Sequence, residues 1–203
     1  HDNDLEKKIV DSFKDNPLLQ EALEFSETNK KFHPEDFGII GIHIQDILMY
    51  YDKIGALHPG WKADGSVNRP ALMIHDLGKK FERDYVPKRG HQEIAVELAE
   101  TLMEIYDETV LRIVRHHDDH YKIYNNRFHS NIEAMFDAML RGLSPREIEL
   151  LIRFGYADRY RKKPLIKRKE YETVKRLYLD QMEWFTDMAK KRNLIDSSFQ
   201  PFA

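Results

Sequence analysis

The hydrophobic positions of the chain recur every three or four residues through most of its length, which is the spacing of one face of an α-helix. Three such stripes are clear, and no segment alternates apolar and polar residues as a run of half-buried strands would. The pattern therefore predicts an all-α protein. The stripes comprise Ile44, Ile47, Leu48 and Tyr51; Ile94, Leu98, Leu102 and Ile105; and Ile148, Leu151, Ile152 and Tyr156.

Helix start signals agree with these stripes. Asn16 and Ser144 each stand directly before a proline, so a capping side chain precedes a residue suited to the first helical turn. Ser144 is also followed three residues later by Glu147, which is the spacing of a capping box. The predicted helices cover residues 4–14, 17–26, 38–54, 70–82, 91–106, 108–118, 131–141, 145–163 and 168–192.

Two segments between the predicted helices have the composition of loops. Residues 55–70 are rich in Gly, Pro and Asn, and residues 118–131 form a second irregular connection. Loops of this length in a compact domain are often functional. We expect one domain over residues 1–203, with an N-terminal helical extension (1–36), a core (37–163) and a C-terminal basic and aromatic helix (164–203).

The composition is that of a globular protein with a formal net charge of -3. No overall basic field indicates nucleic-acid binding, so affinity for phosphates would come from a local patch. No apolar run approaches the roughly 18 residues of a membrane span, and the N-terminal residues resemble no signal peptide. We therefore expect a cytoplasmic protein without a membrane partner. Cysteine is absent, so any metal site must use histidine and carboxylate ligands.

Seven histidine and aspartate residues stand on predicted helix faces or at helix ends. One histidine on an apolar face is usually a core residue, but so many together favour a shared site. Imidazole and carboxylate suit divalent transition metals, and a bridging carboxylate can hold two ions about 3.5 to 4 Å apart for displacement at phosphorus. The residues are His43, His75, Asp76, His91, His116, His117 and Asp158.

The order of these residues resembles the HD-domain superfamily of metal-dependent phosphohydrolases. The resemblance runs from residue 43 to residue 158 and consists of a helical His, then HDLGK, then Gly-His, then His-His, then Ala-Asp. It implies a helical bundle with the metal site between central helices. It also implies one or two divalent ions as cofactor, drawn from Mn, Fe, Co, Ni, Zn and Mg.

The resemblance also assigns ligands. It implies that the first ion is held by His43, His75, Asp76 and Asp158, and that Asp76 bridges to a second ion. The remaining ligands of the second ion would be His91 and one or both of His116 and His117. Neighbouring residues of a helix point about 100° apart, so the sequence leaves the choice within that pair open.

Flanking residues favour one branch of the superfamily. Lys79 and Lys80 stand where alarmone hydrolases typically carry acidic residues. The second histidine of deoxynucleotide triphosphohydrolases and the Gly-Tyr-Pro signature of cyclic-di-GMP hydrolases are missing. The chain is most similar to the HD domains of bacterial tRNA nucleotidyltransferases and RNA-end-repair enzymes, which implies activity on 2'-phosphates or 2',3'-cyclic phosphates. The chain has no nucleotidyltransferase head or phosphate-binding loop, so a kinase, ligase or nucleotidyltransferase would be a partner module.

Several residues are candidates for substrate binding. Residues 159–176 carry nine Lys or Arg against two Glu, and Arg161 and Lys162 would meet phosphates, unless this run is simply a solvated helix face. Tyr121 and Arg127, in the second predicted loop, would contact a base, unless they pack against the core.

The expected reaction is hydrolysis of a phosphomonoester or cyclic phosphodiester of a nucleotide or RNA end by a metal-activated hydroxide. Asp76 would act at the metal pair, and Lys79 would stabilise charge on the phosphoryl oxygens, unless it is merely solvated. The sequence leaves open whether His120, Asp118 or water protonates the leaving oxygen. One alternative function is a phosphohydrolase of free nucleotides, and another is a non-catalytic HD-like binding module. No heptad pattern indicates an oligomeric state.

Overall fold

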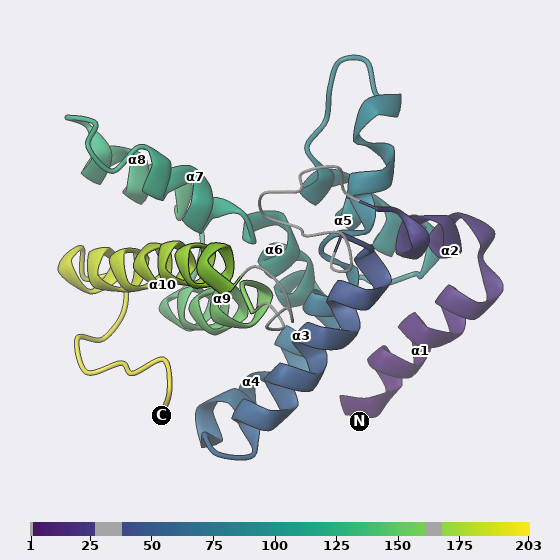
Figure 1. Ribbon diagram of the computed structural model, residues 1–203, viewed down its shortest axis with the longest axis horizontal. Coiled ribbons are helices and arrows are strands. Elements are labelled where there is room, and N and C mark those ends of the chain that lie inside the picture. The colour runs from purple at the N-terminus through teal and green to yellow at the C-terminus, as the bar shows by residue number, and fades with distance from the viewer. Residues whose placement is uncertain (1, 27–37, 161–167) are drawn as a thin grey trace.

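The computed structural model describes residues 2–26, 38–160 and 168–203. Within these ranges the regular elements are helices, apart from one isolated bridge between Ser26 and Ile39, which confirms the all-α prediction. The elements, shown in Figure 1, are α1 (Asp2–Asp15), α2 (Pro17–Glu24), α3 (Ile40–Gly55), α4 (Pro59–Ile74), the 3-10 helix η1 (Leu77–Asp84), α5 (His91–Leu102), α6 (Glu108–His116), α7 (Asp119–Asn125), α8 (Ile132–Met139), α9 (Pro145–Asp158) and α10 (Arg168–Lys191).

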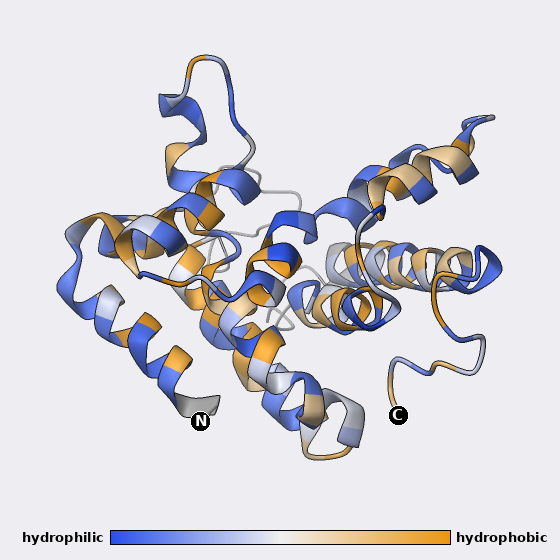
Figure 2. Ribbon diagram, turned by 180° about the vertical axis from the view of Figure 1, so that it is seen from behind, coloured by the Kyte–Doolittle hydropathy of each residue, from blue (hydrophilic) through white to orange (hydrophobic). Residues whose placement is uncertain are grey.

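Helix α4 is central to the packing. It contacts α3, α6 and α9, and it also contacts α1. One hydrophobic cluster extends from Ile9 in α1 to Phe199 after α10, and Trp61 of α4 is its largest fully buried side chain. Hydrophobic and hydrophilic residues alternate along the helices in Figure 2, as expected for amphipathic helices around a shared core. None of the helices within the described ranges combines the length and the apolar character that crossing a bilayer requires.

The prediction of a loop over residues 55–70 was wrong, because α4 begins at Pro59. Proline suits the first helical turn, where its missing N–H would have no partner in any case. The buried positions Trp61, Asp64 and Asn68 then follow at helical spacing. Two of these three are polar, so a pattern of apolar positions cannot reveal this buried face.

The buried polar residues of α4 have partners on α9. Asp64 pairs with Arg153 at 2.8 Å and also with Arg146, both on α9. The side-chain amide of Asn68 donates to the carbonyl oxygen of Leu150, also on α9, at 3.1 Å. These contacts fix α4 against α9, the helix that ends at Asp158.

The predicted helix over residues 70–82 is also corrected, because the chain changes course at the His75-Asp76 pair. Helix α4 ends at Ile74 and η1 begins at Leu77. Gly78 lets η1 approach the first residue of α5, since a Cβ atom there would lie 2.1 Å from the carbonyl oxygen of His91. The change from α-helix to 3-10 helix therefore brings the His-Asp pair beside the start of α5.

The second predicted loop, residues 118–131, is partly helical. Helix α7 lies within it, and its buried residues Asp119, His120, Ile123 and Tyr124 follow helical spacing. Tertiary packing on α10 stabilises this short helix, whose polar composition resembled a loop. The other predicted helices agree with the structure within a few residues at most ends. Helix α5 stops four residues early at Leu102, and α9, predicted to reach residue 163, ends at Asp158.

Both predicted helix caps are present. The Asn16 side chain accepts from the backbone N–H of Leu18 at 3.0 Å, at the start of α2. Ser144 and Glu147 form a reciprocal capping box at the start of α9, with both hydrogen bonds at 3.1 Å. The box anchors the first turn of the helix whose last residue is Asp158.

Candidate metal centre

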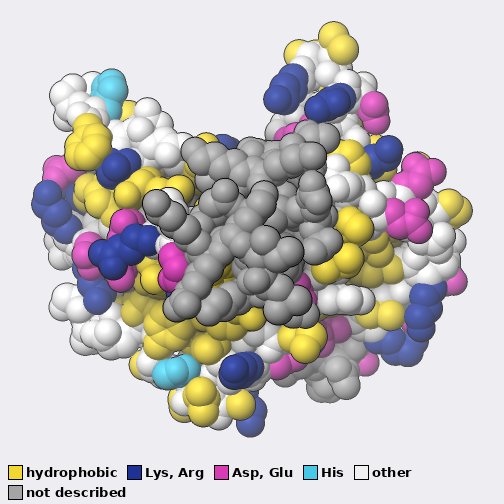
Figure 3. All heavy atoms as spheres, viewed as in Figure 1, with side chains coloured by type: hydrophobic (Ala, Val, Ile, Leu, Met, Phe, Trp, Pro, Cys, Tyr) yellow, Lys and Arg dark blue, Asp and Glu magenta, His cyan; other side chains and the backbone are white. Residues whose placement is uncertain are grey.

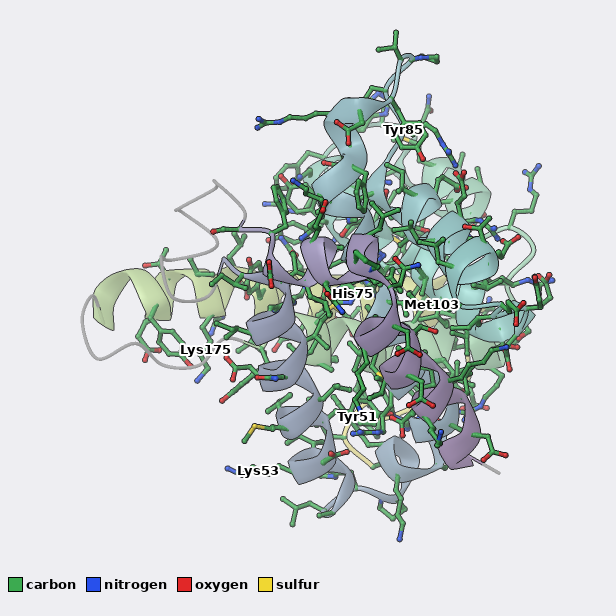
Figure 4. The ribbon with its side chains drawn as sticks, turned by 90° about the vertical axis from the view of Figure 1, so that its right-hand side faces the viewer. Tyr51, Lys53, His75, Tyr85, Met103 and Lys175 are labelled. Atoms are coloured by element: carbon green, nitrogen blue, oxygen red, sulfur yellow. The ribbon has the colours of Figure 1, made fainter. Side chains whose placement is uncertain are left out.

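Four of the predicted ligands converge from three places in the chain. His43 belongs to α3, His75 and Asp76 lie between α4 and η1, and Asp158 is the last residue of α9. One ligand atom from each lies within 4.8 Å of all the others, and we call these four residues the first group. His75, labelled in Figure 4, lies in the interior of the molecule.

The two imidazoles of the first group direct their Nε2 atoms at shared carboxylate oxygens. Asp158 Oδ1 lies 3.1 Å from His43 Nε2 and 2.9 Å from His75 Nε2. Asp76 Oδ2 lies 3.2 Å from His75 Nε2 and 3.9 Å from His43 Nε2. The Nδ1 atom of His75 contacts the carbonyl oxygen of Leu72 at 2.8 Å. When that Nδ1 carries the proton it donates to the carbonyl, and Nε2 then offers a lone pair to a cation.

A second group consists of Asp76, His91 and His117, all buried. The Nε2 atoms of the two histidines face each other at 3.1 Å, and each lies 3.7 Å from Asp76 Oδ1. His91 Nδ1 contacts Glu82 Oε1 at 3.0 Å, and His117 Nδ1 contacts the carbonyl oxygen of Val114 at 2.6 Å. Because both Nδ1 atoms face acceptors, both Nε2 atoms carry lone pairs in the neutral state. Two lone pairs so close repel each other unless a proton or a cation lies between them.

Asp76 belongs to both groups, and its two oxygens face different partners. Oδ2 faces the first group and Oδ1 faces the second. Atoms bound to one ion at about 2.0 to 2.2 Å are themselves about 3 to 3.5 Å apart, close to the separations found in both groups. The donor set and its spacing therefore fit two divalent ions bridged by one carboxylate.

The charges of the first group oppose the effect of burial. Burial alone would lower the pKa of His75, but the attraction of Asp76 and Asp158 outweighs it and raises that pKa to about 10. Burial would raise the pKa of Asp76, yet His75 and then Lys79 hold it well below its usual value. Without an ion, a proton on His75 balances the carboxylates. An ion must displace this proton, so metal binding releases protons.

Lys79 lies beside this centre, as the sequence predicts. Its Nζ atom is 3.0 Å from Asp76 Oδ2, and its side chain is 15% exposed. The ammonium group is therefore near the carboxylate that both groups share and is still in reach of solvent. Its role towards a substrate phosphate stays a prediction.

The adjacent residues His116 and His117 point in different directions, and only His117 faces the centre. His117 joins the second group, whereas His116 is in neither group among the residues that the structure describes, and its Nδ1 contacts Asp119 Oδ2 at 2.6 Å. The helical phase at the end of α6, which the sequence could not supply, makes this distinction.

Of the two side chains considered as proton donors, His120 does not face the centre. It is fully buried, its Nε2 contacts the carbonyl oxygen of Leu151 at 3.1 Å, and its ring packs on Phe185. Burial, followed by the positive charge of Arg159, lowers the pKa of His120 to about 3. His120 is therefore a neutral core residue.

Asp118 does face the centre. Two further residues hold members of the centre in place: Glu82 contacts His91, and Gln92 contacts Asp118. Glu82 accepts from the backbone N–H of His91 at 3.1 Å and contacts the ring of His91 as well. Gln92 donates to Asp118 Oδ2 at 2.5 Å. From the sequence, Asp118 was predicted only as a possible proton donor, and Glu82 and Gln92 were not predicted at all. Their signal in the sequence was their proximity to His91, which becomes informative only once η1 and α5 are placed.

The predicted base-contacting residues lie on α7 and the turn after it. Tyr121 is 46% exposed. The guanidinium of Arg127 stacks over the rings of Tyr124 and Phe128, at 3.9 and 4.4 Å from their centroids. Arg127 is thus engaged locally, and Phe128, although Arg127 lies over its ring, is 88% exposed. Neither Tyr121 nor Arg127 belongs to either ligand group.

Two projections flank a notch on the face seen in Figure 3. One is the turn between α7 and α8, and the other is the connection 85–90 between η1 and α5 (Figures 1 and 3). Arg83 and Lys88 are exposed on or next to the second projection. The remaining predicted phosphate contacts, Arg161 and Lys162, lie outside the described residues.

A comparison with known families identifies most of the chain. The family model of the HD domain matches residues 44–171, which is more than half of the sequence. The matched span begins one residue after His43 and contains every other member of the two groups. No curated protein and no solved structure matches the chain.

Proposed function

The chain belongs to the HD domain family, broadly one of metal-dependent phosphohydrolases, and we propose that it hydrolyses phosphomonoesters or cyclic phosphodiesters of nucleotides or RNA ends. The proposed activity is that of a 2',3'-cyclic phosphodiesterase or 2'-phosphatase. The proposed site is the set of residues that meet at Asp76.

One observation carries this proposal: the carboxylate of Asp76 stands between two buried groups whose imidazole Nε2 atoms converge. Buried polar groups in proteins are normally paired with a partner of the opposite kind. Facing lone pairs beside carboxylates are instead the arrangement that a divalent cation completes. Two such arrangements that share one carboxylate suit displacement at phosphorus.

Divalent ions bound there would activate a water molecule and neutralise charge on the phosphoryl oxygens. The protein's own contribution is to hold the donor atoms in place. Leu72, Val114 and Glu82 accept from the Nδ1 atoms of three histidines and so aim the Nε2 atoms inward.

Lys79 supplies a positive charge beside the shared carboxylate. With divalent ions bound at Asp76, this ammonium would be placed to turn towards a phosphate oxygen of the substrate. His120 is buried away from the centre, and His117 and then His91 lower the pKa of Asp118 against the effect of burial, so the Asp118 carboxylate is ionised. The leaving oxygen is therefore protonated by water.

The preference for a nucleotide or RNA end is supported by exposed aromatic and basic side chains on the two projections. Phe128 and Tyr121 offer rings for stacking on a base, and Arg83 and Lys88 offer positive charge for a phosphate backbone. These features are compatible with a single-stranded end.

A substrate panel tests the proposal. The purified protein is incubated with Mn, Co, Ni or Mg and with 2',3'-cyclic nucleotides, 2'-phosphorylated nucleotides, nucleoside monophosphates or deoxynucleoside triphosphates. We expect release of phosphate or opening of the cyclic ester, and none with Asp76→Ala. Turnover restricted to triphosphates or monophosphates would favour the free-nucleotide alternative. A protein that takes up no metal and cleaves nothing would be a binding module.

A further inference from the structure

We propose that Asp118 is a direct ligand of the second ion, so that the second group comprises Asp76, His91, His117 and Asp118. The inference rests on the metal binding in the proposed function and adds a ligand to it. Asp118 directly follows His117 and lies between the end of α6 and the start of α7.

Both oxygens of Asp118 face the second group. Oδ2 lies 3.2 Å from His91 Nε2, and Oδ1 lies 3.5 Å from His117 Nε2. Both separations fall in the range of about 3 to 3.5 Å expected between two atoms bound to one ion. Asp118 is in fact nearer to these imidazoles than Asp76 is, whose Oδ1 lies 3.7 Å from each Nε2.

The first group already contains a carboxylate in the same relation to its histidines. Asp158 lies 3.1 and 2.9 Å from the Nε2 atoms of His43 and His75. With Asp118 included, each group has two imidazoles, one carboxylate of its own and the shared carboxylate of Asp76. Three carboxylates then face two divalent ions, so the loaded centre keeps a net positive charge that attracts phosphoryl oxygens.

Gln92 holds the Asp118 carboxylate in this position. Its Nε2 atom donates to Asp118 Oδ2 at 2.5 Å, and its side chain is buried next to His91 in α5. A ligating carboxylate is typically oriented by such an outer hydrogen bond. Because the amide is neutral, it orients the carboxylate and leaves its negative charge for a cation.

Asp118 also differs from the other carboxylates in exposure. Its side chain is 30% exposed, compared with 16% for Asp158 and 3% for Asp76. The second ion would therefore have the more solvent-exposed of the two sites. We expect it to be the weaker bound and the more easily exchanged.

Metal binding by calorimetry and by elemental analysis tests the assignment without any substrate. For the wild-type protein we expect two Mn or Co ions. Asp118→Asn should keep the first ion and weaken the second at least tenfold, since even loss of an outer hydrogen bond costs about 10- to 100-fold in affinity. Asp84→Asn is the matched control, because Asp84 is exposed and belongs to neither group. Wild-type affinity for both ions in Asp118→Asn, folded by circular dichroism, would overturn the assignment.

A cysteine variant separates direct ligation from a distant charge effect. The chain has no cysteine, so the thiolate of Asp118→Cys would be unique. A thiolate that binds Co produces an intense ligand-to-metal charge-transfer absorption, and we expect this band in Asp118→Cys and not in Asp84→Cys. Two bound Co ions without the band would contradict direct ligation.

The outcomes for Asp118 and for the proposed function are distinguishable. Two bound ions with the charge-transfer band, but no hydrolysis of any phosphate ester, would refute the function and leave Asp118 as a ligand. Hydrolysis and two ions with unchanged binding in Asp118→Asn would refute only the ligand. A wild-type protein that binds no ion refutes both.

Discussion

Two buried aspartates near opposite ends of the same helix have very different partners. Asp64, in the first turns of α4, pairs with Arg153 at 2.8 Å and with Arg146. Asp76, just past the end of α4, is surrounded by histidines and Lys79. Both carboxylates are almost inaccessible to solvent, at 1% and 3% exposure.

The two aspartates differ in whether their partners can lose a proton. A guanidinium is always charged, so the pairing of Asp64 with arginines is permanent and serves the packing of α4 on α9. An imidazole can lose its proton and expose a lone pair, so the pairing of Asp76 can be exchanged for a metal ion. A buried acid among arginines is thus structural, and one among histidines is available for chemistry.

The largest effect should come from Asp76. We expect Asp76→Ala to lower hydrolysis at least about a thousandfold, since single electrostatic groups in active sites contribute about 10²- to 10³-fold and this one serves both ions. The histidines left behind can shed their protons, so the helical fold should remain. Rate measurements together with circular dichroism and thermal unfolding check this, and full activity in the variant would refute the mechanism.

Asp64→Ala should instead lower the stability of the fold. It leaves the guanidinium of Arg153 buried without its carboxylate, and breaking a buried ion pair in this way costs about 3 to 5 kcal/mol of unfolding free energy. Urea denaturation measures the loss, and exposed Asp84→Ala is the control, with a change of less than about 0.5 kcal/mol. If Asp64→Ala were as stable as Asp84→Ala, the structural role of the arginine cluster would be wrong.

The same contrast explains what the sequence could predict. The order of His43, His75, Asp76 and Asp158 was visible because ligand types on helix faces can be recognised without knowing their partners. Helix α4 was missed because its buried Asp64 owes its place to Arg153, 89 residues further along the chain.

The choice between His116 and His117 was hidden for a different reason. Adjacent residues leave a helix in different directions, and which one faces inward depends on the phase of α6 against α4 and α5. Such a phase is set by tertiary packing. The all-α class and the ligand order were therefore predictable, but the chain's turn at the His-Asp pair and the contacts of Glu82 and Gln92 were not.

Lys79 should give an intermediate effect that separates substrate binding from metal binding. Lys79→Met removes a positive charge next to Asp76, so we expect about a 10- to 100-fold loss in kcat/KM, with two metal ions still bound. Lys80→Met is the neighbouring control, because Lys80 makes no ion pair with either ligand group among the described residues. Equal losses in the two variants would indicate a general charge effect.

The smallest effect is a dependence of metal binding on pH. His75 has a pKa raised to about 10, so it is protonated in the metal-free protein at neutral pH, and the ion must displace that proton. Metal affinity should therefore rise with pH below this value, by up to about tenfold per pH unit for each proton released.

The metal-free protein should respond to pH in the opposite direction. A raised pKa contributes stability that is complete below about 6.5, the unfolded value, and is lost as the pH rises towards 10. Calorimetry in buffers of different ionisation enthalpy counts the released protons, and thermal unfolding with and without Mn follows the stability. If this decline in metal-free stability comes from His75, it should disappear in His75→Gln. If the decline persists in that variant, the proton that balances Asp76 and Asp158 does not reside on His75.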